Sequence, residues 1–378
     1  MPDLNELLRW SIANSTPPTS GAQGDGTTGA EQPPLSLRFN PASETPSPGS
    51  SALHPSDPQY GTSSYGGQNA EDHPAHSTNT PAANPALNSE ILEAIMGKSD
   101  STVMKEKMAF ALDESNDVDQ RVEALDDFEM LIEHLDNANN MAVLKLWEPI
   151  LSLLSSPHET IVAHACWIIG TAVQNNIKAQ SALYAHNALS QILTVISPSS
   201  SHSPATRSRA TYALSSALKH WPLASSALSA SSSRGYQTLK EGIRDPEPVV
   251  RKKMQFLIGT LVMQSGEQYS GELPKEVAEI LKEQGQTTDG NARESLVEGL
   301  KREGIFVTVL EALKSQKGGD VEFEENAMRA LVNATEKGGL DTSEKEQVKQ
   351  IWESWGKDGR EERGLGGNEG DDMAKILA

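Results

Sequence analysis

The sequence predicts an all-α protein built from stacked helical repeats. From Asn88 onward, apolar residues recur at the spacing of amphipathic helices, each about 12 to 18 residues long. No segment alternates apolar and polar residues with the period of two that is typical of strands. In addition, one apolar pattern of ten residues returns several times along the chain, which indicates a solenoid.

Two segments show the repeat most clearly. HACWIIGTAV, from His164 to Val173, aligns without gaps to KMQFLIGTLV, from Lys253 to Val262, and both contain the triplet IGT. Three further segments fall into the same register, namely EALDDFEMLI at Glu123 to Ile132, RATYALSSAL at Arg209 to Leu218 and NAMRALVNAT at Asn326 to Thr335.

The spacing of equivalent positions indicates the type of repeat. Successive intervals are 41, 45, 44 and 73 residues, measured between Glu129, Gly170, Ser215, Gly259 and Val332. The first three match armadillo or HEAT units of about 40 to 47 residues, and the last leaves room for an irregular unit around residues 291–313. Because one helix pair cannot cover its own apolar face, we expect a right-handed armadillo/HEAT-like solenoid whose last helices line a concave surface.

Composition divides the chain into four parts. Residues 1–15 form a short amphipathic motif. Residues 16–88 are crowded with Gly, Pro, Ser and Thr and cannot bury enough apolar surface to fold, so we expect a long disordered linker. Residues 89–356 form the repeat domain, and residues 357–378 are rich in Gly and Glu, which favours a flexible acidic tail.

The composition also excludes several classes of protein. The single cysteine, Cys166, excludes an internal disulfide framework and is expected to be a buried structural thiol. The chain shows neither a secretory signal nor an apolar run long enough to span a membrane, so we expect a cytoplasmic protein, with the nucleus as the alternative. The net charge of −20 argues against nucleic acid and anionic membranes as partners.

Charge is unevenly distributed within the repeat domain. Residues 89–158 carry 15 acidic and 5 basic residues, whereas residues 204–253 carry 3 acidic and 9 basic ones. This asymmetry is explained either by a surface for a charged partner or by chance clustering on a solvated surface.

No motif for catalysis or metal binding stands out. HETIVAH, from His158 to His164, has histidines six residues apart, whereas a zinc-protease helix needs a spacing of four. GLGGNEG, from Gly364 to Gly370, lacks the preceding strand that a nucleotide-binding loop requires. The chain contains no phosphate loop, serine elbow or pair of carboxylates, so we expect no enzyme activity, no metal and no cofactor.

Four segments closely resemble the Fes/HspBP family of nucleotide exchange factors for seventy-kilodalton heat-shock chaperones. They are LNELLRWSIANS at Leu4 to Ser15, DDFEMLIEHLDNANNMAVLKLWEPILSLL at Asp126 to Leu154, IIGTAVQNNIKAQ at Ile168 to Gln180 and TYALSSALKHWP at Thr211 to Pro222. The linker is longer than the family pattern, and residues 221–236 are unusually rich in Ser and Ala.

The resemblance implies a monomeric co-chaperone without catalytic chemistry. Its groove would embrace one lobe of the chaperone's ATPase domain, open the nucleotide cleft and so release ADP and then client. Two alternatives stay open: an armadillo scaffold that holds a peptide cargo, and an enzyme that carries helical repeats.

Alignment of the units places candidate binding residues in columns along the groove. The first column is basic and contains His164, Arg209 and Lys253. The second is aromatic and contains Trp167, Tyr212 and Phe256, while Thr171 and Asn175 follow one and two turns after Trp167. Interfaces favour aromatic and Arg anchors, although an aromatic column also suits a core.

The run DNANN, from Asp136 to Asn140, breaks the helical pattern between two apolar segments. Its short polar side chains suit either helix capping or contact with a partner. The resemblance favours a contact centred on Ala138, flanked by Asn137 and Asn139. Leu146 and Trp147 are expected to pack inside.

The N-terminal motif contains five apolar residues and is too short to be a stable helix alone. We expect it to act as a bait for the chaperone's substrate-binding domain, or alternatively to dock on the protein's own repeats. The residues concerned are Leu4, Leu7, Leu8, Trp10 and Ile12.

Overall fold

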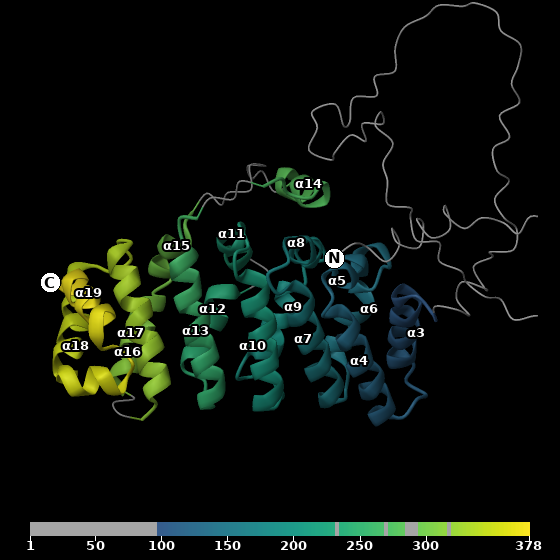
Figure 1. The fold of residues 1–378 in the computed structure, drawn as a ribbon, viewed down its shortest axis with the longest axis horizontal. Helices are drawn as coiled ribbons and strands as arrows, with labels where there is room; N and C mark the ends of the chain where they lie inside the picture. Colours follow the sequence, from purple (N-terminus) through teal and green to yellow (C-terminus); the bar gives the residue numbers. More distant parts are fainter. Residues whose placement is uncertain (1–96, 231–233, 268–270, 284–293, 316–318) are drawn as a thin grey trace, which may run out of the picture. The chain divides into compact units, whose positions relative to one another are not determined.

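The computed structural model describes residues 97–230, 234–267, 271–283, 294–315 and 319–378, which belong to one compact unit (Figure 1). The predicted N-terminal motif and linker lie outside these residues. The regular elements of the described part are helices: α3 (Asp100–Leu112), α4 (Val118–Ile132), α5 (Leu135–Val143), α6 (Trp147–Ser152), η1 (Leu153–Ser155), α7 (Glu159–Val173), α8 (Ile177–Ala185), α9 (Leu189–Ile196), α10 (Pro204–Leu218), α11 (Ala224–Ser229), α12 (Gly235–Ile243), α13 (Pro248–Gln264), α14 (Lys275–Glu283), α15 (Leu296–Arg302), α16 (Ile305–Ser315), α17 (Val321–Glu336), α18 (Thr342–Glu362) and α19 (Gly367–Leu377).

Five helices stack side by side in a row, which we call the central row. It consists of α4, α7, α10, α13 and α17, and each member contacts the next (Figure 1). These helices contain the five positions that the sequence aligned, so the predicted all-α repeat architecture is confirmed. Helix α13 packs directly on α17. The 73-residue interval between Gly259 and Val332 therefore contains no further helix of the central row.

The core follows the apolar pattern that repeats along the sequence. Ala165, Ile169 and Ala172 of α7 are at most 1% exposed. Leu146 and Trp147 are also buried, as predicted. No helix in the described part is long and apolar enough to cross a membrane.

The two glycines of the repeated IGT triplet have different surroundings. A Cβ on Gly170 would collide with the Tyr212 ring and lie 3.2 Å from Cα of Ala213, so glycine lets α7 and α10 approach closely here. A Cβ on Gly259 would meet Ala330 Cβ at 3.9 Å, which is ordinary contact. The shared triplet therefore reflects a steric need in only one of the two repeats.

Polar clamps join successive repeats at the start of the row helices. Glu159, in the first turn of α7, accepts a hydrogen bond from the Ser203 backbone N–H at 2.7 Å and lies 2.8 Å from Nδ1 of His202. Arg207 of α10 then pairs with the fully buried Asp245 ahead of α13, at 2.8 Å. Each clamp ties one unit to the next.

The C-terminal residues differ from the predicted flexible tail. Helix α18 turns sharply at Gly356, where φ is 60°, and α19 follows with Met373 and Leu377 buried. Arg363, between the two helices, pairs with buried Glu324 of α17 at 2.6 Å. The glycines that suggested flexibility instead allow turns with positive φ, and apolar and paired charged residues pack the segment against α17.

Candidate functional site

Trp167 of α7 connects side chains of three row helices, α4, α7 and α10. The residue is 40% exposed, and its Nε1–H donates to Oε1 of Glu129 at 3.0 Å. The Thr171 hydroxyl donates to the same carboxylate oxygen at 2.9 Å. Glu129 of α4 therefore fixes two side chains of α7, and so the orientation of the indole.

The opposite side of Trp167 contacts α10. The rings of Trp167 and Tyr212 are 5.1 Å apart between centroids, and the Arg209 guanidinium carbon lies 5.7 Å from the Trp167 centroid. Tyr212 in turn donates its hydroxyl to Gln174 Oε1 at 3.2 Å. Contacts of this kind hold the aromatic rings and the Arg in place before any partner binds.

The basic column continues onto α13. Lys253 Nζ donates to the Ser208 carbonyl at 3.4 Å, which brings it beside Arg209. Burial lowers the pKa of Lys253, and the neighbouring charge of Arg209 lowers it further. Towards the other end of the row, His164 Nε2 lies 3.0 Å from Asp126 Oδ1. The exposed row thus passes from acidic residues on α4 to basic residues on α10 and α13.

Three exposed or partly exposed side chains on the row, Glu129, Met130 and Met263, were not among the predicted binding residues. Phe256, which was predicted, is 58% exposed, and Met263 on the same helix is 64% exposed. Met130 of α4 is 66% exposed. Glu129, the residue before it, accepts the hydrogen bond from the Trp167 indole. Met263 could have been found, because it follows Phe256 by two helical turns.

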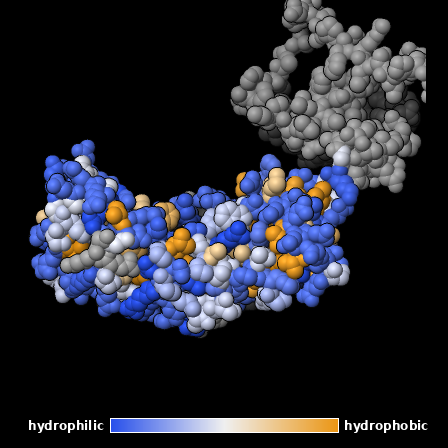
Figure 2. Space-filling view, turned by 90° about the horizontal axis from the view of Figure 1, so that it is seen from below, coloured by the Kyte–Doolittle hydropathy of each residue, from blue (hydrophilic) through white to orange (hydrophobic). Residues whose placement is uncertain are grey.

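We call ten exposed or partly exposed residues of the row the central strip. They are Glu129, Met130, His164, Trp167, Thr171, Arg209, Tyr212, Lys253, Phe256 and Met263. Figure 2 shows one face of the molecule, on which hydrophobic residues form separate patches within a largely hydrophilic surface.

The remaining predicted residues lie elsewhere. DNANN does not break a helix, since it lies within α5. Asn137 and Ala138 belong to the buried face of that helix at 6% and 3% exposure, and Asn137 Nδ2 donates to Asp100 Oδ2 at 2.7 Å. The structure therefore leaves Ala138 no exposed side chain, and Asn139 is partly buried beside it.

Asn175 was predicted to lie two turns after Trp167 on the same helix, but it lies outside α7. Helix α7 ends at Val173, and Asn175 adopts a left-handed conformation with φ of 52° in the following turn. Asparagine tolerates this conformation better than most residues, which explains its presence there.

Two other features of α7 have structural explanations. His158 precedes the first residue of α7, whereas His164 lies within the helix. Cys166 is buried, as predicted, and burial raises the pKa of its thiol to about 12. The thiol therefore stays protonated near neutral pH and is a poor nucleophile.

Stacked units with one exposed helix face per repeat define an armadillo-type repeat protein. Two designed armadillo repeat proteins superpose on 74% of this chain with TM-scores of 0.50, at 13% and 12% identity. They are themselves covered over 98% and 100% of their length, and one was solved with the peptide (KR)4. At such low identity the likeness concerns the fold alone.

Comparison with protein families is more specific. Residues 59–141 match the family "Nucleotide exchange factor Fes1", and residues 137–357 match the "SIL1/FES1/HPBP1 C-terminal domain". A protein of Cryptococcus neoformans var. neoformans, named Hsp70 nucleotide exchange factor FES1, is 55% identical over 93% of both chains. A Mycosarcoma maydis protein of the same name is 44% identical over 46% of this chain and 43% of its own. The chain belongs to the Fes1 family of nucleotide exchange factors.

Proposed function

We propose that this chain is a co-chaperone that exchanges nucleotide on an Hsp70 chaperone and performs no chemical step itself. The observation that carries the proposal is the 55% identity to an Hsp70 nucleotide exchange factor across 93% of both chains. At that identity and coverage, the two proteins share the whole arrangement of repeats rather than one motif.

The mechanism requires only differential affinity. If the repeats bind the chaperone's ATPase domain more tightly when its nucleotide cleft is open, binding increases the open population and ADP leaves faster. Each difference of about 1.4 kcal/mol between the two affinities changes that population about tenfold. By reciprocity, ATP that closes the cleft weakens the complex, so the factor is released after exchange and client release follows.

The central strip is the surface that we assign to the ATPase domain. Trp167 and Tyr212 are pre-positioned by Glu129 and Gln174, so little side-chain entropy is lost when they bind. Partly exposed aromatics beside an Arg are the residue types that dominate protein interfaces. Arg209 and Lys253 suit an acidic region on the chaperone lobe, and the acidic α4 end suits a basic one.

A finer part of the proposal concerns residues outside the described structure. Residues 1–15 act as a bait for the substrate-binding domain, tethered by residues 16–88. A flexible chain of roughly 70 residues has a root-mean-square reach of about 40 to 50 Å, which lets the bait search beyond the strip. We further propose a monomer that works in the cytoplasm, without a nucleic-acid or membrane partner.

Release of labelled ADP from a cytosolic Hsp70, measured by stopped-flow fluorescence, tests the main proposal. We expect faster ADP release with the full chain, and much weaker acceleration with Trp167→Ala, which removes the central anchor of the strip. A Lys105→Glu variant, at an exposed position on α3, should behave as the unmodified protein. An ADP release rate that saturating protein leaves unchanged would refute exchange activity.

Two further experiments test the peptide-cargo alternative and the proposed bait, residues 1–15, separately. In a pull-down, ATP should release Hsp70 from an exchange factor, whereas a peptide-cargo scaffold would not respond to ATP. Deletion of residues 1–15 should leave ADP release intact and slow displacement of a labelled peptide client. A deletion that lowers ADP release and thermal stability together would mean that this segment docks on the repeats.

A further inference from the structure

The loop between α9 and α10 contains two serines that are each followed by proline. Residues 197–204 read SPSSSHSP, with Ser197 directly after α9 and Ser203 directly before α10. Both serines have extended backbones, with φ and ψ of −51° and 131° at Ser197 and −63° and 156° at Ser203. Proline favours this conformation in the preceding residue, and an extended Ser-Pro segment is the form that proline-directed kinases accept.

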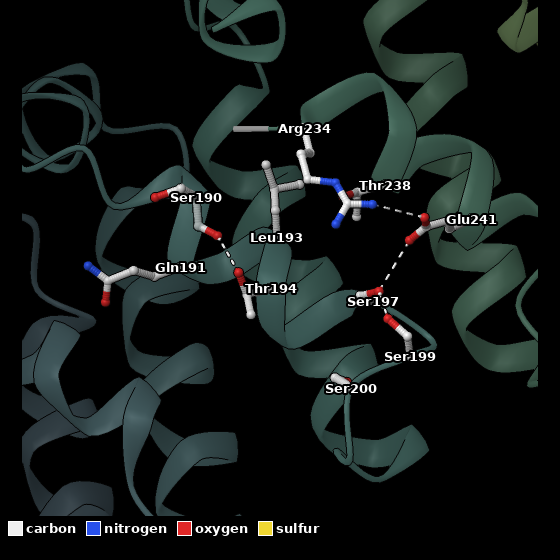
Figure 3. Close-up of a pocket in the computed structure, with 10 residues that line it drawn as sticks. All are labelled: Ser190, Gln191, Leu193, Thr194, Ser197, Ser199, Ser200, Arg234, Thr238 and Glu241. Atoms are coloured by element: carbon white, nitrogen blue, oxygen red, sulfur yellow. Dashed lines mark hydrogen bonds and ion pairs between the residues drawn. The ribbon is translucent and has the colours of Figure 1, made fainter. Parts of the chain in front are cut away.

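Ser197 borders an open pocket of about 350 Å³ between α9 and α12, lined by Leu193 and by polar and charged residues (Figure 3). Its hydroxyl donates to Glu241 Oε2 at 3.2 Å and lies 2.8 Å from the hydroxyl of Ser199. On the far side, Arg234 Nη2 contacts Glu241 Oε1 at 3.5 Å. Arg234 and Glu241 are the charged residues among the described residues that line this cavity.

The surroundings distinguish the two serines. Ser203 caps α10, since its hydroxyl accepts from the Thr206 N–H at 3.2 Å, and its own N–H donates to Glu159. A phosphate there would remove the cap of α10 and disrupt the clamp between α7 and α10. Ser197 has no such capping role in the described structure, and open space lies beside it.

We propose that Ser197 is a phosphorylation site for a proline-directed kinase and that Arg234 binds the resulting phosphate. The Ser197 hydroxyl oxygen attacks the γ-phosphorus of ATP, an O–P bond forms, the bond to the β-phosphate oxygen breaks, and ADP leaves. The hydroxyl proton passes to the base of the kinase.

The added charge can be accommodated if Arg234 exchanges its ion-pair partner, Glu241, for the phosphate. The Arg234 side chain is 70% exposed and its contact with Glu241 is long, so little is lost when the guanidinium turns to a dianionic phosphate. Glu241 Oε2 then has to turn away from position 197, while Oε1 retains its hydrogen bond from Gln237 Nε2 at 3.1 Å. Phosphorylation would thus connect the loop before α10 to the start of α12.

Phosphate incorporation into the full chain tests the site. The purified protein is incubated with ATP and a mitogen-activated kinase, and each phosphosite is quantified by peptide mass spectrometry. Mapping by site is necessary because the chain has further Ser/Thr-Pro pairs at Thr16, Thr45, Ser47, Thr80 and Ser156. We expect incorporation at Ser197, abolished by Ser197→Ala and retained in Ser203→Ala. Modification of Ser203 with Ser197 unmodified would overturn the assignment.

The role of Arg234 is tested separately, with phosphoserine installed at position 197 during synthesis and observed by ³¹P NMR. An ion pair with Arg234 should hold the second pKa of this phosphate below the usual value of about 6. Arg234→Gln should raise that pKa, and Glu241→Gln, which removes the facing carboxylate, should lower it. A titration that neither substitution moves would show that the phosphate lies in solvent. Because Trp167 is unchanged, ADP release by the unphosphorylated variants reports separately on the proposed exchange function.

Discussion

Gly170 and Gly259 occupy the same register position but are held there by different constraints. The Tyr212 ring and the Ala213 backbone leave no room for a Cβ at Gly170. Since Tyr212 also stacks on Trp167, a methyl group at Gly170 would displace part of the central strip. At Gly259, the nearest neighbour lies at ordinary contact distance.

Gly170→Ala should therefore destabilise the protein, and Gly259→Ala should stabilise it by about 0.5 to 1 kcal/mol, the usual gain of alanine over glycine inside a helix. Urea denaturation measures both free energies of unfolding. Trp fluorescence should shift only in Gly170→Ala. Equal stability changes in the two variants would show that Tyr212 moves aside at no cost.

The sequence predicts some side-chain positions better than others. The column of Trp167, Tyr212 and Phe256 follows from register alone, because equivalent positions on stacked helices share a face. The hydrogen bond from Trp167 to Glu129 could not be predicted, since it joins residues of different repeats and depends on the interaxial distance. The contact at Ala138 was predicted from the family resemblance, whereas the structure buries Ala138 next to Asn137, whose amide is hydrogen-bonded inside the protein.

The clamp between α7 and α10 makes the stability of this pair depend on pH. Burial alone would raise the pKa of Glu159, but hydrogen bonds from Thr206, His202 and Ser203 outweigh it and lower the pKa from 4.5 to about 2. A carboxyl whose pKa is depressed on folding stabilises the protein above its unfolded pKa, and this contribution is lost as pH falls from about 4.5 towards 2.

Glu159→Gln should accordingly be less stable than the unmodified protein at pH 7, and the difference should shrink as pH falls below about 4.5. Urea midpoints recorded between pH 7 and pH 3 measure this trend. An exposed Glu123→Gln variant on α4 serves as the control and should follow the unmodified protein. A pH-independent difference would mean that Glu159 acts through packing rather than charge.

The C-terminal helices depend on a buried ion pair. Arg363 and Glu324 have side-chain exposures of 9% and 1%, so removal of the arginine leaves a carboxylate in the interior. Arg363→Met should cost about 3 to 5 kcal/mol, and Arg363→Met combined with Glu324→Met should recover most of it. Thermal unfolding measures the stability of the single and the double variant. A double variant as unstable as the single one would show that hydrogen bonds, rather than charge burial, hold α18 and α19.

Element prediction succeeded where apolar periodicity was strong and failed where composition was the guide. The five row helices follow from one repeated pattern. The C-terminal segment was predicted to be flexible from its glycines and charges, yet Gly356 and Gly364 only form turns with positive φ. Its order comes from contacts with α17, which no local pattern reveals.

Across the whole molecule, charge is segregated along the central row. Reversing Arg209 and Lys253 to Glu should slow association with Hsp70 more than reversing Lys105 and Lys178, although both pairs change the net charge equally. Lys105 and Lys178 are exposed on α3 and α8, away from the strip. Association rates at low and high salt measure the effect, and the gap should narrow in high salt. Equal rates at low salt would mean that the basic column does not face the chaperone.

The order of contacts along the central row has a consequence for biosynthesis. Each row helix packs on the one that precedes it in the chain, so a nascent chain can bury its apolar faces unit by unit as it leaves the ribosome. Helix α14 is an exception, because it returns to α8, two units earlier, and its Val277 is fully buried. Until α14 has been synthesised, the surface of α8 that it contacts stays open, so this contact forms only after α10 and α13 have been made.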